Sequence, residues 1–274
     1  MIVVTGATGS IGRALIERLD GEGEEVLAVL RRPADLGCEY VLGDFDRPET
    51  VGEALSAGDR LFLNTSPWPG FVRGHRAVID LAREAGVAQV VSVSVRGAAP
   101  GAPLAGGMHG EVDDHLRASG VPWSILRPVG FMQNLLTDVR DGRIYGSYGQ
   151  GRVGYIDTRD IADVAAALLT RPVGPDGTYV LTGPDAPTQD EIAAAVSGAL
   201  GREVRYVDLP VPEMAAHLAG QGIPEPFARD LARLMADTGD GRWSTTTSTV
   251  EDVTGHRPRS LAAFLADHAA TWPA

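Results

Sequence analysis

Three glycines near the start of the chain have the spacing of a phosphate-binding turn. Gly6, Gly9 and Gly12 follow a short apolar run and precede an amphipathic one, so a strand, a tight turn and a helix are predicted in that order. Glycine permits the turn, lets the backbone approach a pyrophosphate and lets the helix pack on the strand, while the helix N-terminus attracts anions. We predict a dinucleotide site made by Gly6, Thr8, Gly9, Ser10, Ile11 and Gly12.

The residues after the second predicted strand bear on the choice of nicotinamide cofactor. An acid there would hold the ribose of NAD, whereas an arginine accepts the 2′-phosphate of NADP. This strand ends in Arg31 and Arg32 with no acid, and planar guanidinium groups pair well with phosphate. NADPH (NADP) is therefore the favoured cofactor. The alternative is that both arginines are solvated surface residues.

Short apolar runs alternate with amphipathic stretches, a rhythm that predicts a parallel sheet covered by helices. Strands are expected at 2–5, 25–30, 40–42, 60–64, 89–94, 123–126 and 178–181. Helices are expected at 11–19, 49–56, 72–85, 110–118, 160–169, 189–200, 211–219, 226–236 and 259–268, with a turn at 127–131 followed by a loop or hairpin through residue 151. The fold class is α/β: a Rossmann-type doubly wound parallel sheet with a smaller, mainly helical C-terminal substrate lobe. Residues 1–134 and 152–182 are expected to form the NAD(P)-binding domain, and residues 135–151 and 183–274 the substrate-binding lobe.

Composition argues against several classes of partner. The formal net charge of −12, with no run of arginines, should repel a nucleic-acid backbone. No apolar stretch is long enough to span a bilayer, and the N-terminal segment does not read as a signal peptide. Cys38 is the only cysteine, as is usual in a reducing compartment. We expect a cytoplasmic bacterial protein, a monomer or homodimer, that binds neither nucleic acid nor membrane.

Five motifs along the chain carry a family resemblance. They are Gly-Ala-Thr-Gly at 6–9, Gly-Asp-Phe-Asp at 43–46, His-Arg-Ala-Val-Ile-Asp at 75–80, Leu-Arg-Pro at 126–128 and Tyr-Ile-Asp-Thr-Arg-Asp-Ile-Ala at 155–162. Together they resemble the NmrA-like atypical short-chain dehydrogenase/reductases, and within these the bacterial NADPH-dependent quinone oxidoreductases of the second type. That group includes redox-sensing regulators as well as reductases.

The resemblance implies further contacts with the cofactor. Asp44 and Phe45 occupy the place where this superfamily holds adenine between a carboxylate and an apolar side chain. Ser94 matches the family's substrate-side serine. The remaining implied cofactor residues are Asn64, Thr65 and Ser66 at the second ribose, and Val129 and Phe131 at the nicotinamide ring, with Asn134 near the substrate.

The usual catalytic pair of this superfamily is missing. A standard member protonates a carbonyl with a tyrosine whose pKa is lowered by a lysine four residues later, but all 24 basic residues of this chain are arginines. His109 and Asp113 stand at the matching place, one helical turn apart, so Asp113 could orient or charge His109. We expect His109, Ser94 and Asn134 to be catalytic. The alternatives are a pocket-lining histidine and an ordinary strand-end serine.

A metal site at the same segment is not expected. Two imidazoles and nearby carboxylates make a plausible ligand set, but His109 and His115 are six residues apart and would face different directions on one helix. A serine hydrolase is excluded in turn, because Ser94 lacks the glycine-flanked nucleophile elbow.

Aromatic residues follow two predicted strands at the edge of the sheet where ligands bind. They suit a flat conjugated acceptor such as a quinone or enone. The alternative is that they fill the seam beside the lobe. The expected substrate-binding residues are Trp68, Phe71, His109, Phe131, Met132 and Asn134. We therefore expect an NADPH-dependent reductase that transfers hydride to such an acceptor. The alternative is a non-enzymatic NADP(H)-binding redox-sensing regulator that acts through protein partners.

Overall fold

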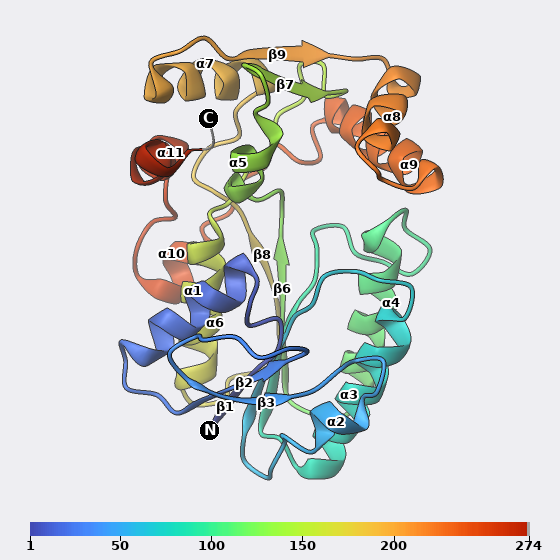
Figure 1. Ribbon diagram of the computed structural model, residues 1–274. Helices are drawn as coiled ribbons and strands as arrows, with labels where there is room; N and C mark the ends of the chain where they lie inside the picture. The colour runs from blue at the N-terminus through green and yellow to red at the C-terminus, as the bar shows by residue number, and fades with distance from the viewer. Residues whose placement is uncertain (273–274) are drawn as a thin grey trace. The chain divides into compact units, whose positions relative to one another are not determined.

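The computed structural model describes residues 1–272 and divides the chain into two compact units (Figure 1). The first unit contains Met1–Pro128, Thr158–Val180 and Asp252–Gly255. The second contains Val129–Asp157, Leu181–Glu251 and the chain from His256 onward. The assignment of cofactor binding to residues 1–134 and 152–182, and of substrate binding to the rest, stays a prediction.

A seven-stranded sheet forms the centre of the first unit, with strand order β3-β2-β1-β4-β5-β6-β8 among the described residues. Strands β1 to β6 pair in parallel. The order reverses between β1 and β4, which is the place where sheets of this kind open a crevice at their carboxyl edge. The predicted doubly wound sheet is confirmed. The strands are β1 (Ile2–Val4), β2 (Val26–Leu30), β3 (Glu39–Leu42), β4 (Arg60–Leu63), β5 (Gln89–Val93), β6 (Trp123–Pro128) and β8 (Gly177–Leu181).

Helices cover both faces of this sheet (Figure 1). On one face lie α1 (Ser10–Asp20) and α6 (Thr158–Thr170), and on the other α2 (Glu49–Gly52), α3 (Phe71–Ala85) and α4 (Ala105–Ala118). On the second face, strand residues such as Leu61 and Val90 pack against Val78 of α3 and Leu116 of α4. Helix α3 ends at Ala85 and is capped by Gly86, whose φ of +75° suits glycine.

Of the predicted helices, α2 and α4 differ from their predicted bounds by more than two residues at one end. Helix α2 is shorter than 49–56 because the bonds after it, such as Leu55 N to Gly52 O (3.0 Å), join residues three apart. Helix α4 begins five residues before the predicted start at 110. Glycines lower helix propensity and hid this turn, but a Cβ at Gly110 would overlap the backbone of Ala99.

The second unit has a two-stranded parallel sheet of β7 (Arg143–Gly146) and β9 (Arg205–Asp208) with helices around it. Two apolar clusters hold it together, one around Ile144 and Phe264 and the other around Met214 and Ala228. Its helices are α5 (Leu135–Asp138), α7 (Gln189–Leu200), α8 (Val211–Gly220), α9 (Glu225–Ala236) and α11 (Leu261–His268), with 3-10 turns η1 (Met132–Asn134), η2 (Asp237–Asp240) and η3 (Ala269–Thr271), and α10 (Thr249–Thr254) has residues of both units. Within residues 1–272, no helix has the length and apolar character needed to cross a membrane.

Strand β3 is one of the two edge strands of the seven-stranded sheet, with β8 at the other edge. All four of its residues are exposed. Tyr40, Val41 and Leu42 are 44%, 36% and 56% exposed, and they are among the few large apolar side chains on the described surface. One backbone edge of β3 therefore has no partner strand within the sheet.

Candidate active site

The glycine turn packs tightly at the carboxyl edge of the first unit's sheet. Gly6 has a φ of +64°, and a Cβ at this position would overlap the carbonyl oxygen of Asn64, just after β4. A Cβ at Gly12 would overlap the carbonyl oxygen of Gly6 and lie 2.7 Å from Cα of Ala7. The turn can therefore be close to β4, and α1 close to the turn, only with glycine at both positions.

The first turn of α1 is open to the surface. Thr8, Gly9 and Ser10 are exposed, and the first turn carries no acidic residue. Gly9 is the N-cap and has no side chain with which to satisfy the N–H groups of that turn. Ile11 is 5% exposed, so only its backbone can serve an anion here. These residues fit a bound pyrophosphate.

Thr5 joins the two strands on either side of the reversal in strand order. It is fully buried, and its hydroxyl lies 3.0 Å from the carbonyl oxygen of Phe62 and 3.1 Å from that of Asn64. The hydroxyl oxygen of Thr5 also accepts a hydrogen bond from the backbone N–H of Asn64 (2.9 Å). Thr5 thus fixes the backbone that Gly6 contacts. Sequence reasoning did not single it out, although a hydroxyl at the last position before the turn was a visible signal.

The two arginines after β2 are free to meet solvent. Arg31 and Arg32 directly follow Leu30, the last residue of β2, and both are exposed. Because β1 and β2 pair in parallel, their carboxyl ends lie next to each other in the sheet. The arginines therefore belong to the same edge as the glycine turn.

Asp44 and Phe45, the two residues predicted to hold adenine, both make contacts within the protein. The carboxylate of Asp44 accepts a hydrogen bond from the N–H of Asp46 (3.0 Å). Phe45 is only 8% exposed and belongs to the apolar cluster beneath α3. Its ring lies 4.8 Å from that of His75 and 5.9 Å from that of Trp68. The structure thus puts the Phe45 side chain in the core rather than on a surface open to adenine.

Trp68 lines a hollow of about 510 Å³ together with Asp46, Pro69, Gly70 and Arg73. Its indole N–H donates to the carboxylate of Asp46 (3.0 Å), which also lies 3.5 Å from the guanidinium of Arg73. The indole ring contacts Phe71 edge-on at 5.5 Å. Trp68 is therefore held in a fixed orientation with part of its surface open.

Phe71, predicted to bind substrate, is instead a core residue. It is 1% exposed, and its ring packs against His75 at 3.9 Å and against His109 at 4.7 Å. As the first residue of α3, it enters the core directly from the turn that carries Trp68. Phe71 thus packs against the His109 ring, and almost none of its own surface is open to a ligand.

His109 is a buried, neutral histidine. It is 7% exposed, and burial lowers its pKa to about 4. At pH 7 the imidazole therefore carries one N–H donor and one acceptor nitrogen.

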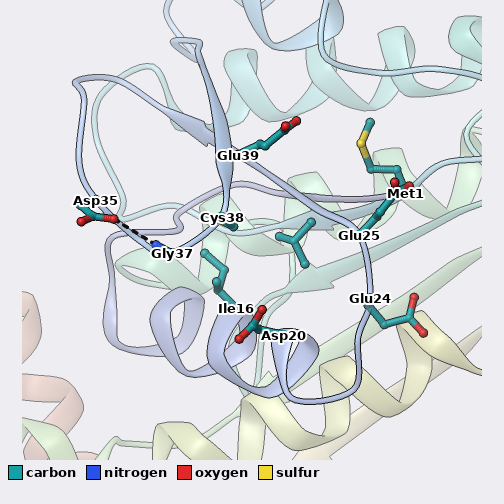
Figure 2. A pocket seen from close by; sticks show the side chains of 10 residues that line it. Met1, Ile16, Asp20, Glu24, Glu25, Asp35, Gly37, Cys38 and Glu39 are labelled. Carbon is teal, nitrogen blue, oxygen red and sulfur yellow. Dashed lines mark hydrogen bonds between the residues drawn. The ribbon is translucent and has the colours of Figure 1, made fainter.

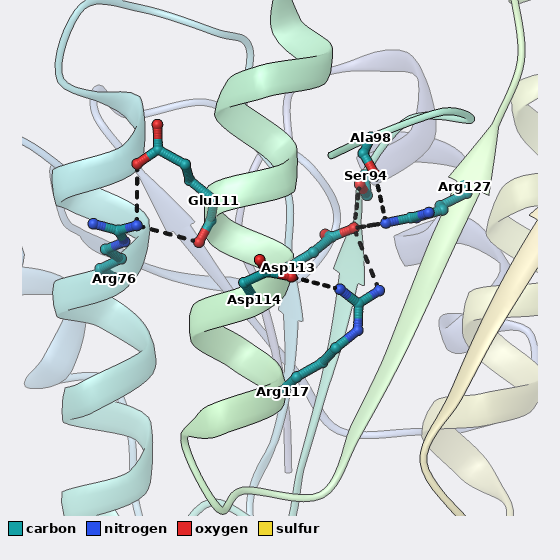
Figure 3. A network of polar contacts seen from close by, with 8 residues as sticks. All are labelled: Arg76, Ser94, Ala98, Glu111, Asp113, Asp114, Arg117 and Arg127. Atoms are coloured by element: carbon teal, nitrogen blue, oxygen red, sulfur yellow. Dashed lines mark hydrogen bonds and ion pairs between the residues drawn. The ribbon is translucent and has the colours of Figure 1, made fainter. Parts of the chain in front are cut away.

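Asp113 does not orient His109, contrary to the prediction, but forms a separate polar network (Figure 3). Its carboxylate accepts hydrogen bonds from Ser94 Oγ (3.0 Å) and from Nη2 (2.6 Å) and Nε (3.1 Å) of Arg127. Arg127 also donates to the carbonyl of Ala98 (2.9 Å). Burial raises the pKa of Asp113, and Arg127 opposes that rise. The network joins β5, α4 and β6, and it holds the buried Ser94 hydroxyl toward Asp113 rather than toward a substrate.

The expected nicotinamide and substrate residues after β6 belong to the second unit. Val129 and Met132 are 7% and 2% exposed, so both side chains face the core. Phe131 is partly buried and pairs with Ile156 through an isolated bridge, with Met132 N donating to Ile156 O (2.9 Å). Asn134 is exposed at the end of η1. Phe131 and Asn134 are therefore the two that keep an open side chain.

A second hollow, of about 600 Å³, lies at the amino ends of β1 and β2 (Figure 2). Its lining includes the carboxylates of Asp20, Glu24, Glu25, Asp35 and Glu39, beside Cys38. Burial raises the pKa of the Cys38 thiol, which makes it less reactive. A lining so rich in acids does not suit a phosphate-bearing cofactor.

Comparison with known proteins places these features in a family context. Residues 6–172 match the family described as NAD(P)H-binding. The NAD(P)H azoreductase of Xenophilus azovorans is 36% identical over 285 residues, which cover 100% of each chain.

Solved structures extend the similarity to the whole fold. The NADPH-dependent quinone oxidoreductase of Escherichia coli, in complex with NADPH, is 26% identical with a TM-score of 0.85, covering 97% of this chain and 99% of that one. The Citrobacter sp. triphenylmethane reductase, in complex with NADP(H), is 25% identical with a TM-score of 0.84, covering 98% and 100% of the two chains. NmrA, at 15% identity and a TM-score of 0.76, shares the fold.

Proposed function

The chain belongs to the NAD(P)H-binding family and is an NAD(P)H-dependent oxidoreductase, and from that premise we propose that it uses NADPH to reduce an electron-poor conjugated acceptor. The observation that carries the choice of acceptor is the state of His109. This histidine is buried and neutral in a chain without a single lysine, so no strong proton donor of the Tyr/Lys kind is available.

The cofactor proposal rests on the glycine turn and the arginines beside it. The open N-terminus of α1, at Gly9 to Gly12, would receive the pyrophosphate. The exposed guanidinium groups of Arg31 and Arg32 would pair with the 2′-phosphate of NADPH. Asp44, with Asn64 to Ser66, would lie along the adenosine and second ribose. Ser94 would contact the cofactor with its backbone atoms, because its hydroxyl donates to the carboxylate of Asp113.

The proposed chemistry needs little acid catalysis. NADPH supplies a hydride when bound, with two electrons passing to the acceptor. A quinone or enone spreads this charge over a conjugated system, and the proton that completes reduction then comes from water. The N–H of His109 would hydrogen-bond an acceptor oxygen, and the partly exposed ring of Trp68 would pack against the acceptor's flat face. Positioning would thus supply most of the rate.

The relatives support this class of acceptor. They are described as an azoreductase, a quinone oxidoreductase and a triphenylmethane reductase, and the substrates in these names are all extended conjugated molecules. Azo dyes, quinones and triphenylmethane dyes differ in shape, but each accepts hydride into a delocalised system.

The decisive experiment is anaerobic mixing of the purified protein with NADPH and a panel of quinones, enones, azo dyes and saturated ketones. We expect loss of nicotinamide absorbance with conjugated acceptors and none with the saturated ketones. Equal turnover of saturated ketones would contradict the proposal, as would no turnover of any acceptor by protein that binds NADPH.

Replacing Arg31 by Ala tests the cofactor. The change should weaken binding of NADPH by about 10-fold or more, because a charge-assisted pair with phosphate is lost, and should leave NADH nearly unchanged. Fluorescence titration of both cofactors measures this. Arg229→Ala is a matched control, since Arg229 is an exposed arginine on α9 that pairs with Glu225 and contacts no residue proposed to bind the cofactor. An equal loss for NADPH and NADH would remove the argument.

A further inference from the structure

His75 is buried in α3 with both ring nitrogens in contact with polar atoms. It is 2% exposed, and its ring packs at a tilt against those of Phe45, Trp68 and Phe71. Its Nδ1 lies 2.8 Å from the carbonyl oxygen of Phe71, and its Nε2 lies 3.3 Å from the hydroxyl of Thr65. Neither the glycine turn nor the hydride chemistry accounts for this histidine.

The contacts fix which nitrogen carries the hydrogen. A carbonyl oxygen only accepts, so Nδ1 must be the donor to Phe71. Burial also lowers the pKa of His75 to about 3, so the ring is neutral at pH 7 and Nε2 has no hydrogen. The hydroxyl of Thr65 must then donate to Nε2.

This direction determines what Thr65 offers to a ligand. The single hydroxyl hydrogen of Thr65 is then used by His75, so the hydroxyl oxygen of this partly exposed residue can only accept a hydrogen bond from a ligand. Thr65 follows Asn64, whose backbone is bound to Thr5 and lies against Gly6, so the hydroxyl belongs to the same edge of the sheet as the glycine turn.

We propose that His75 is a positioning residue that makes Thr65 an obligate hydrogen-bond acceptor, and that Thr65 thereby selects a ribose hydroxyl in the nicotinamide half of NADPH. The proposal rests on the proposed function, because it takes NADPH to be the ligand at this edge. In this proposal, the buried His75 does not touch the cofactor, but it determines that Thr65 accepts rather than donates the hydrogen bond to the ribose.

The first test is the tautomer of His75, which does not depend on any cofactor. Nitrogen NMR of protein labelled at histidine, with His75→Phe used to assign the signal, should show Nδ1 protonated and Nε2 unprotonated at pH 7. The reverse tautomer, or a doubly protonated ring, would overturn the proposal.

The second test compares Thr65→Val with Thr65→Ser, using NADPH and adenosine 2′,5′-bisphosphate as ligands. The Val variant should lose about 10-fold in NADPH affinity, since a ligand hydroxyl is left without an acceptor, whereas the Ser variant keeps it. Neither should change binding of the bisphosphate, which lacks the nicotinamide ribose. An unchanged affinity of the Val variant for NADPH, or an equal loss for both ligands, contradicts the inference. Failure of the wild type to bind either ligand contradicts the proposed function instead.

The third test couples the two residues. His75→Phe should weaken NADPH by about 3-fold, and in the double variant with Thr65→Val it should add nothing further, because both changes act on one contact. His75→Gln, whose amide oxygen can accept from Thr65, should restore binding and serves if the Phe variant does not fold. Fully additive losses would show that His75 acts only on stability.

Discussion

At the scale of single residues, the state of His109 decides what kind of catalysis is open to this chain. A neutral imidazole can donate a hydrogen bond, but it holds no proton ready for release at pH 7. The ring packs against Phe71 at 4.7 Å, and burial is the cause of its low pKa. A hydrogen-bonding role is thus the chemistry that this environment supports.

Replacing His109 by Gln should cost less than about 10-fold in the rate of hydride transfer, because the amide keeps a hydrogen-bond donor. Loss of a true general acid typically costs about 10²–10⁴-fold. With its pKa at about 4, His109 should produce no inflection between pH 5.5 and 8 in single-turnover rates. An inflection near pH 6.5 that disappears in the Gln variant would contradict this prediction.

At the scale of elements, the contact between α1 and the glycine turn depends on the absence of a side chain. Gly12→Ala would push Cβ into the carbonyl oxygen of Gly6, so the turn and its phosphate site must shift. We expect a loss of more than about 10-fold in NADPH affinity, by calorimetry. Gly198→Ala in α7 is the control, because nothing lies within 4 Å of its Cβ. That variant should gain about 0.5–1 kcal/mol in stability and bind NADPH normally.

The buried pair of Asp113 and Arg127 joins α4 to β6, and breaking it should be expensive. Asp113→Asn or Arg127→Met should each cost about 3–5 kcal/mol in the free energy of unfolding, because a charge or donor is left buried without its partner. Denaturant unfolding measures this. The exposed pair of Arg229 and Glu225 is the control, and Arg229→Ala should cost no more than about 1 kcal/mol. Equal costs for the two pairs would contradict the assigned role.

Sequence periodicity predicted the main sheet well, since its buried strands are apolar runs. It missed β7 and β9 because their residues, Arg-Ile-Tyr-Gly and Arg-Tyr-Val-Asp, do not form an apolar run, and because the two strands pair across about 60 positions in the chain. The glycine turn was also predictable, because the backbone itself forms it. Side-chain direction was not: Phe45, Phe71 and Met132 read as ligand contacts, but they face the core. Neighbouring residues of a strand or loop can point to opposite sides, so the sequence does not show which apolar side chain faces a pocket and which faces the core.

At the scale of the whole molecule, the two buried histidines link stability to pH. Unfolded histidines gain protons below about pH 6.5, whereas His75 and His109 stay neutral in the folded chain until about pH 3 and about pH 4. The folded pKa values are depressed, so the free energy of unfolding falls as pH drops below about 6.5. Each histidine contributes a slope of at most about 1.4 kcal/mol per pH unit.

The variant His109→Gln isolates one share of this slope. Its unfolding free energy, measured in urea from pH 7 to pH 4, should fall less steeply than that of the wild type. Asp113 acts in the opposite direction, because its raised pKa lets the folded chain bind a proton first, but this contribution is common to both proteins and cancels in the difference. Parallel curves for the two proteins would contradict the assignment.

The exposed edge strand β3 has a consequence for self-association of the protein at high concentration. A short apolar strand with one unsatisfied backbone edge is a template for edge-to-edge pairing. Each molecule carries a formal net charge of −12, and the repulsion between molecules keeps two such edges apart at moderate ionic strength. Colloidal stability is therefore conditional: salt that screens this repulsion, or acid that neutralises the carboxylates, should bring Tyr40, Val41 and Leu42 of neighbouring molecules together.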